Sequence, residues 1–199
     1  LERIIARKAR NAFADWNVLS IQHLLGSNFR FVEAVHRLGA KKEDVVTVGI
    51  PYSTSETVAR TMNEGGLETL TPPLNIAAWE RQVEDALHAM VERSKKNGKK
   101  IVVFDDGGLV AKILHEKPWA KEHQHLFRIV EQTTRGITVA KKYDLQVPLV
   151  NYAQDPAKNL EGSMIGEVVL DRIYRRLDAI GKKEQLKGMP ITCVGAGVI

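Results

Sequence analysis

The residues best suited to chemistry are two adjacent carboxylates, Asp105 and Asp106, which follow the apolar run 101–104 and precede two glycines. A short, unbroken apolar run is typical of a strand that is covered on both faces of a parallel sheet. In open parallel sheets, ligands bind outside the carboxyl ends of the strands. Asp106 then acts either as a general acid or base, or as the cap of a following helix. The stretch alone leaves both interpretations open.

Polar residues also follow other predicted strands. His23 ends a predicted strand at 18–23, where it serves either as a catalytic group or as a structural hydrogen-bonding histidine. Thr133 and Thr134 follow a predicted strand at 126–131 and act either as ligand contacts or as a helix cap. The tail Gly195-Ala196-Gly197 follows a predicted strand at 190–194. It matches only the first half of a dinucleotide-binding fingerprint, which alone is a weak signal.

The elements that position these residues alternate along the chain. Further strands are predicted at 45–50, where Pro51 ends the strand, and at 67–70 and 147–151. Helical spacing of apolar residues predicts helices at 1–15, 26–38, 53–64, 76–93, 109–115, 133–142 and 160–180. Strands that alternate with helices at these distances indicate an α/β fold with a mostly parallel sheet.

Composition excludes several classes of protein. The 199 residues are 44% apolar and 27% charged, as in ordinary globular chains, and contain no apolar run long enough to span a membrane. The single cysteine, Cys193, excludes an internal disulfide and is expected in the core; we therefore expect an intracellular, cytoplasmic protein. The net charge of +5 is scattered and lacks interleaved aromatic residues. We thus expect no nucleic-acid or membrane partner.

Several motifs, in order, resemble those of the adenosylhomocysteinase family. The stretch 104–108 resembles its Asp-Asp-Gly-Gly-Asp, and 131–136, Glu-Gln-Thr-Thr-Arg-Gly, resembles its Glu-Glu-Thr-Thr-Thr-Gly. His23-Leu24-Leu25 lies where the family has His-Met-Thr after its first strand. Residues 52–56 and 159–162 resemble its Phe-Ser-Thr-Gln-Asp and Asn-Leu-Tyr-Gly, and the glycine-rich tail resembles the start of its NAD domain.

The resemblance implies an NAD-dependent reaction without net redox, in which the ribose 3′-hydroxyl of a nucleoside thioether is transiently oxidised and the thiol then leaves. A general base must remove a proton from the activated carbon. The resemblance implies catalytic roles for Asp106, as this base, and for His23. It implies substrate contacts from Thr54, Asp105, Gln132 and Lys158, and NAD contacts from Thr133, Thr134, Asn159, Gly195 and Gly197.

The resemblance also implies a domain organisation. Residues 1–158 are expected to form a substrate-binding α/β domain with a Rossmann-like sheet, and 159–183 a hinge helix. Residues 184–199 are expected to be the first strand and glycine turn of a second, NAD-binding Rossmann domain that continues past Ile199. We expect no stable NAD binding by residues 1–199 alone. The expected partners are a small nucleoside or thioether substrate and other copies of the chain in a homo-oligomer.

The sequence departs from the family at points that bear on chemistry. Leu25 replaces the family's threonine, and Gln132 replaces a glutamate and cannot act as a base. The segment with the lysine and aspartate that serve the 3′-hydroxyl is shorter here, and Asp155 and Lys158 are the nearest residues of those types. Three functions therefore stay open: a hydrolase with an altered substrate, a catalytically silent nucleoside- or NAD-binding relative, and an ordinary NAD(P)-dependent dehydrogenase.

Overall fold

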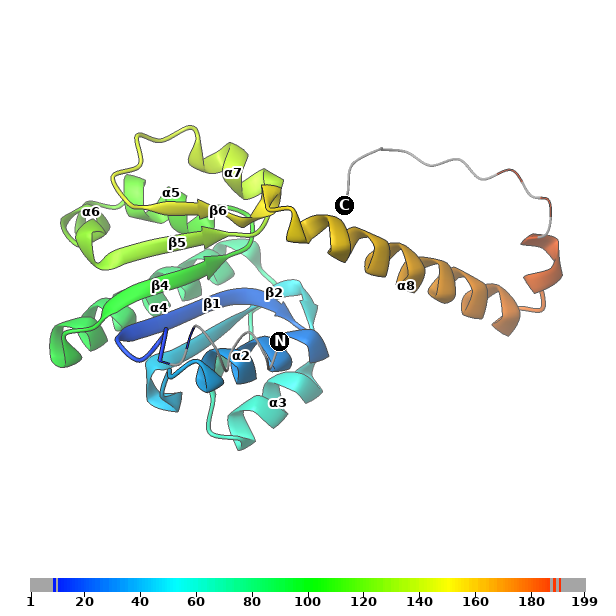
Figure 1. Cartoon of the computed structure of the whole chain (residues 1–199), viewed down its shortest axis with the longest axis horizontal. Coiled ribbons are helices and arrows are strands. Elements are labelled where there is room, and N and C mark those ends of the chain that lie inside the picture. Colours follow the sequence, from blue (N-terminus) through cyan, green and yellow to red (C-terminus); the bar gives the residue numbers. More distant parts are fainter. Residues whose placement is uncertain (1–8, 10, 187, 189, 191–199) are drawn as a thin grey trace. The chain divides into compact units, whose positions relative to one another are not determined.

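The chain forms two compact units, Leu1–Tyr152 and Ala153–Ile199. The computed structural model describes residue 9, residues 11–186, residue 188 and residue 190. The first unit is an α/β domain, and the second contains a long helix, α8 (Ala157–Ala179), followed by a 3₁₀ turn at Lys183–Leu186 (Figure 1). None of the helices in these described ranges is both long and apolar enough to cross a membrane.

The first unit is built on a six-stranded sheet in the order β3-β2-β1-β4-β5-β6, in which every neighbouring pair is parallel. This sheet confirms the predicted α/β class with a Rossmann-like arrangement. The strands are β1 (Trp16–Leu24), β2 (Val45–Thr54), β3 (Glu68–Leu70), β4 (Lys100–Asp105), β5 (Phe127–Glu131) and β6 (Leu149–Asn151).

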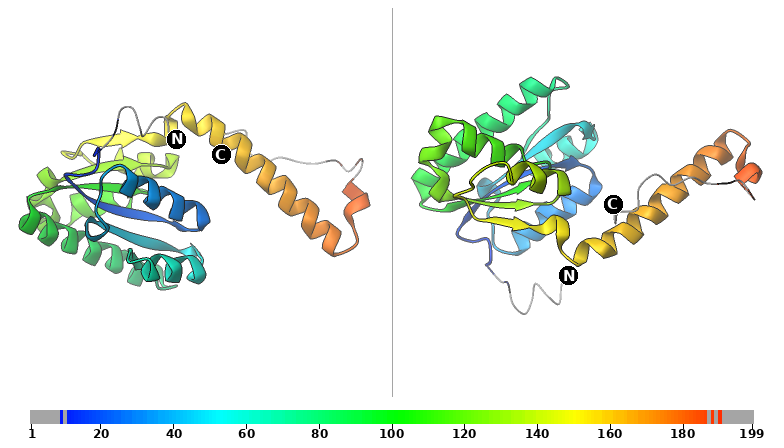
Figure 2. Two further views of the ribbon diagram at one scale, coloured as in Figure 1. Left: turned by 60° about the horizontal axis from the view of Figure 1, so that its bottom comes forward. Right: turned by 90° about the horizontal axis from the view of Figure 1, so that it is seen from above.

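Helices cover both faces of this sheet (Figure 2). One face packs against α2 (Gly26–Arg37) and α3 (Glu56–Glu64) through residues such as Val32 and Met62. The other face packs against α4 (Ile76–Asn97), α5 (Leu109–Glu116), α6 (Pro118–Glu122) and α7 (Thr134–Ala140). Because both faces are covered, successive residues of the central strands are buried, as in the apolar run at 101–103 of β4.

Several predicted boundaries are wrong, for local reasons. Pro51 does not end β2, which continues to Thr54. The pairing of β1 with β2 shifts register between Gln22 and Leu24, and a proline is tolerated at such a bulge because the ladder is interrupted there. As a result α3 begins at Glu56, with Ser55 as its cap, and not at Ser53.

Other differences lie at element ends. Residues 11–15 form turns and not the predicted helix, and the rest of that prediction lies outside the described residues apart from residue 9. Helix α4 runs on to Asn97 and ends at Gly98, whose φ of +71° suits glycine. Helix α7 and strand β6 are shorter than predicted, and α6 was not predicted. The predicted strand at 190–194 lies outside the described residues, except for Pro190.

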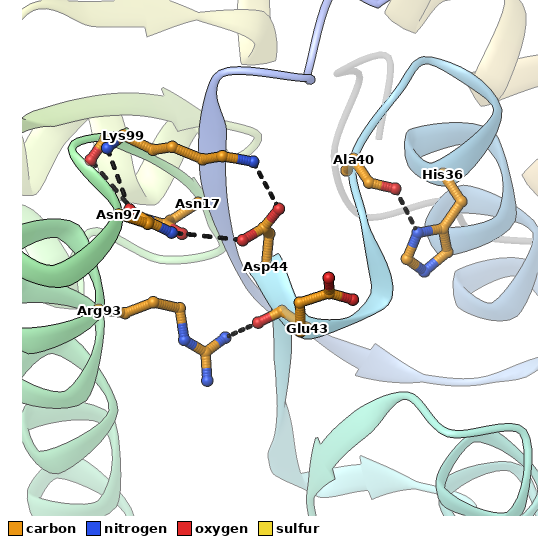
Figure 3. A network of polar contacts seen from close by, with 8 residues as sticks. All are labelled: Asn17, His36, Ala40, Glu43, Asp44, Arg93, Asn97 and Lys99. Carbon is orange, nitrogen blue, oxygen red and sulfur yellow. Dashed lines mark hydrogen bonds and ion pairs between the residues drawn. The ribbon is translucent and has the colours of Figure 1, made fainter.

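The amino ends of β1 and β4 are tied together by a polar network that we call the amino-edge cluster: Asn17, Asp44, Arg93, Asn97 and Lys99 (Figure 3). Lys99 Nζ lies 2.6 Å from Asp44 Oδ2, and both side chains are largely buried. Asn17 and Asn97 exchange amide hydrogen bonds of 3.2 and 2.9 Å. Arg93 donates to the Glu43 carbonyl and pairs with Glu68. Charges of opposite sign therefore satisfy one another at this edge.

Candidate functional site

The candidate site lies where the strand order reverses direction. Connections from β1 run to β2 and β3, whereas those from β4 run to β5 and β6, so the β1–β4 boundary is the topological switch point of the sheet. Ligands of open α/β sheets bind outside the carboxyl ends of the strands at such a point. His23 lies near the end of β1, and Asp106 directly follows β4. The two predicted catalytic residues therefore meet at the place the fold provides for a ligand.

His23 and Asp106 form a pair across the switch point. His23 Nε2 lies 3.5 Å from Asp106 Oδ2, and the two side chains are 38% and 17% exposed. The Tyr52 ring packs edge-on against the imidazole, with centroids 5.8 Å apart. A histidine and a carboxylate that share access to solvent at this distance can exchange a proton with each other or with a bound molecule.

Asp105 has a different role from its neighbour. Its side chain is fully buried and accepts hydrogen bonds from the Asp106 and Val110 backbone N–H groups, each at 3.0 Å. Asp105 therefore satisfies a backbone N–H group in the first turn of α5. Burial and the nearby Glu131 charge raise the pKa of Asp105 to about 8, so its carboxyl is protonated at neutral pH. Because its side chain is fully buried, Asp105 is suited to holding the loop and not to contacting a ligand.

Glu131 is the partner of Asp105 on the next strand, because the two residues are paired in the β4–β5 register. Its Oε1 accepts from the backbone N–H groups of Gly107 at 3.2 Å and Thr133 at 2.8 Å, and from the Thr133 hydroxyl at 2.7 Å. Burial raises the pKa of Glu131. Its Oε2 is buried without a hydrogen-bond partner among the described residues. Two buried carboxyl groups thus hold the loop that carries Asp106.

Two glycines make room for this arrangement. A Cβ at Gly136 would collide with the Glu131 carboxyl group, so only glycine fits there. Gly108 has a φ of +82°, and a Cβ there would lie 2.8 Å from Val139 Cβ. The motifs at 104–108 and 131–136 are therefore two halves of one structure, which we call the carboxyl-edge clamp: Asp105, Gly107, Gly108, Glu131, Thr133 and Gly136.

A cleft of about 410 Å³ opens beside the clamp. Its volume is within the range of small-molecule sites. Apolar side chains form much of its wall, and charged groups from α4, α5 and the two clamp loops lie at its rim. The lining residues are Tyr52, Ile76, Trp79, Glu80, Asp106, Gly107, Gly108, Leu109, Lys112, Thr133, Arg135 and Val139.

The other predicted substrate residues are placed less favourably. The Thr54 hydroxyl donates to the Ile50 carbonyl at 2.9 Å and supports the end of β2. The Gln132 backbone N–H donates to the Asp105 carbonyl at 3.1 Å, and its Nε2 is buried without a partner in the described part of the chain. Lys158 belongs to the second unit, so the structure does not place it relative to the cleft.

Of the described residues predicted to contact NAD, the structure places only Thr133 in the lining of the cleft. Thr133 lines the cleft, but its hydroxyl already donates to Glu131 and accepts from the Gly136 N–H, which makes it the cap of α7. Thr134 is exposed on the first turn of that helix. Asn159 lies in α8 with its side chain outside the described part, and Gly195, Gly197 and Cys193 lie outside the described residues. The described residues thus provide a ligand cleft but not the glycine turn for a dinucleotide.

Sequence reasoning missed residues that the cleft brings together. Glu131 was recognised only as part of a motif, although it lies two residues after the buried Ile129 and so on the same face of its strand. Trp79, Lys112 and Arg135 come from three separate helices, and nothing in their spacing along the chain joins them.

Within the described ranges, no three or more histidine, cysteine, aspartate or glutamate side chains lie close enough together to hold a metal ion. A scan against protein-family models finds no match for the chain.

Proposed function

We propose that the chain is the substrate-binding part of an adenosylhomocysteinase-like, NAD-dependent hydrolase that acts on a nucleoside thioether. The observation that carries the proposal is the His23–Asp106 pair beside the cleft at the switch point. The motif resemblance adds the ligand class. A cytoplasmic, homo-oligomeric enzyme is part of the same proposal.

The chain's own residues account for two of the proton transfers in this proposal, the one at the ribose carbon and the one at the departing thiol or attacking water. Asp106 Oδ2 accepts the proton from the ribose carbon, and His23 holds the proton of the departing thiol or attacking water. The clamp keeps Asp106 in place, because Asp105 fixes its backbone N–H and Glu131 fixes that of Gly107. When NAD is bound, it supplies the transient oxidation that makes the carbon acidic.

A catalytically silent nucleoside-binding relative is the second candidate. Gln132 favours it, because this amide stands where the family has a glutamate and its buried Nε2 has no partner among the described residues. A neutral amide cannot supply the charge of a carboxylate to a bound hydroxyl. In this second candidate, the cleft binds a nucleoside but the protein does not catalyse the reaction.

The experiment is a calorimetric titration with adenosine and adenosylhomocysteine, together with an assay of thiol release by the full-length protein, with the proposed NAD domain, in the presence of NAD. The hydrolase proposal predicts that adenosine binds, and that thiol release is lost in Asp106→Asn. Tight nucleoside binding by the full-length protein without thiol release would establish the silent relative. The absence of any nucleoside binding at millimolar concentration would refute both candidates.

A further inference from the structure

The charged side chains that line the cleft differ in whether the structure gives them a partner. Lys112 Nζ lies 3.7 Å from Glu80 Oε2, and Asp106 pairs with His23. Arg135 also lines the cleft, but it has no hydrogen bond or ion pair with any residue that the structure describes. Arg135 therefore lines the cleft without an ion pair of its own among the described residues.

The position of Arg135 is not explained by helix stability. It lies in the first turn of α7, which contains no acidic residue. A cation in the first turn gains nothing from the helix dipole and is weakly destabilising there. In the motif at 131–136 the family has a threonine at this position.

Exposed apolar side chains line the same cleft as these charged groups. Tyr52 is 77% and Ile76 is 52% exposed, although both line the cleft. Trp79 is fixed beside them, because its Nε1 donates to the Gly49 carbonyl at 2.8 Å. A cleft that combines exposed apolar side chains with an unpaired cation is suited to a ligand with an apolar or aromatic part and an anionic group.

We propose that Arg135 forms an anion subsite in this cleft, which selects ligands that carry a carboxylate or phosphate group in addition to the part held against Tyr52, Ile76 and Trp79. A guanidinium can bind either anion through two parallel hydrogen bonds. The inference rests on the proposed function only in taking the cleft beside Asp106 as the ligand site. It assigns a selectivity that the family motif, with its threonine, does not provide.

The test compares neutral and anionic probes of one shape. Adenosine, adenosine 5′-carboxylate and adenosine 5′-monophosphate are titrated into the wild-type chain and Arg135→Gln at low ionic strength. We expect one of the two anions to bind about tenfold more tightly than adenosine to the wild type, since one charge-assisted contact is worth somewhat more than 1 kcal/mol. Arg135→Gln removes this advantage and leaves adenosine binding unchanged. The anion with the larger advantage identifies the group.

Matched controls separate charge from fold. Arg135→Lys keeps the charge but not the paired hydrogen bonds, so it retains part of the preference. Arg60→Gln removes another exposed arginine, from α3 on the other face of the sheet, and retains the whole preference. Equal weakening of all three probes by Arg135→Gln, or no preference for either anion in the wild type, would overturn the subsite.

A probe without a ribose separates this inference from the proposed function. If adenosine fails to bind but phenyl phosphate binds and requires Arg135, then the nucleoside function fails and the anion subsite stands. If adenosine binds and no anion is preferred, then the anion subsite fails and the nucleoside-binding function stands. If neither phenyl phosphate nor either nucleotide anion binds at millimolar concentration, the subsite is refuted.

Discussion

The two edges of the sheet use buried polar groups in opposite ways. At the amino-edge cluster, Lys99 meets Asp44 and the asparagine pair is mutually satisfied, so opposite charges and matched donors meet (Figure 3). At the carboxyl-edge clamp, two carboxyl groups lie on paired positions of adjacent strands, and Glu131 Oε2 has no partner among the described residues. The polar groups of the amino-edge cluster named here therefore satisfy one another.

From this difference we infer that the buried polar groups at the amino edge serve stability, and that those at the carboxyl edge serve a ligand site. Buried carboxyl groups with raised pKa values cost stability and cluster at functional sites. In this chain they lie beneath the loop that carries Asp106 and beside a cleft, whereas the satisfied network lies at the opposite ends of the strands. We therefore expect changes at the amino edge to affect stability alone, and changes at the carboxyl edge to affect stability and ligand binding together.

The largest effect is expected from Gly136→Ala. The added methyl group would collide with the buried Glu131 carboxyl group, so we expect a loss of about 3 kcal/mol or more in the free energy of unfolding. Urea denaturation followed by circular dichroism measures this loss. Adding Glu131→Ala removes the colliding group, so the double variant should be more stable than Gly136→Ala.

Gly166→Ala is the matched control. It changes a glycine in α8 that has open space around its Cβ position, and it should be neutral or stabilise by about 1 kcal/mol. Equal losses in the Gly136→Ala single variant and in its double variant with Glu131→Ala would contradict the clamp.

A smaller loss is expected from Lys99→Met at the opposite edge. Removal of Lys99 leaves the carboxylate of Asp44, which is only 6% exposed, without its cation. Removal of one partner of a buried pair is costly; because Lys99 is partly exposed, we expect about 2 kcal/mol. Nucleoside binding should be unchanged. A change of more than a few-fold in the dissociation constant would break the separation between the two edges.

The last prediction concerns the pH dependence of stability and how it differs between the wild type and one variant. The pKa of Asp105 rises from 3.8 to about 8 in the fold, so the folded state binds more protons than the unfolded state between these values. Its contribution to stability is full below about pH 4 and is lost as the pH rises through about 8. Glu131→Gln removes one cause of the raised pKa, so this variant should lose less stability between pH 5 and pH 8 than the wild type.

Denaturant unfolding at these two pH values measures that loss. The Lys99→Met variant, which leaves the clamp unchanged, should keep the wild-type pH dependence. An identical pH dependence in Glu131→Gln and wild type would show that the two carboxyl groups are not coupled.

Most of the fold could be predicted because it depends on local signals. Unbroken apolar runs mark strands that are buried on both faces, and the alternation with helices implies parallel pairing. The errors arise where neighbours decide the outcome. The bulge that allows β2 to pass through Pro51 depends on pairing with β1, and the short α6 begins at Pro118, a residue suited to a helix start.

The candidate site could be predicted in position but not in detail. Strands that meet at a switch point bring His23 and Asp106 together, and this follows from strand order. Alternation along β4 places Asp105 on the same face as the buried Val103, a signal that would have separated it from Asp106. The contact of Gly136 with Glu131 depends on how α7 packs against β5, which no spacing in the sequence encodes.

The most direct test of the account compares Asp106→Asn with Lys99→Met in paired measurements of adenosine binding and unfolding free energy. The account predicts that Asp106→Asn weakens binding about tenfold with little change in stability. It predicts the opposite result for Lys99→Met, with stability lowered and binding intact. Adenosine binding that is equally strong in wild type and Asp106→Asn would contradict the claim that the switch-point cleft is the functional site.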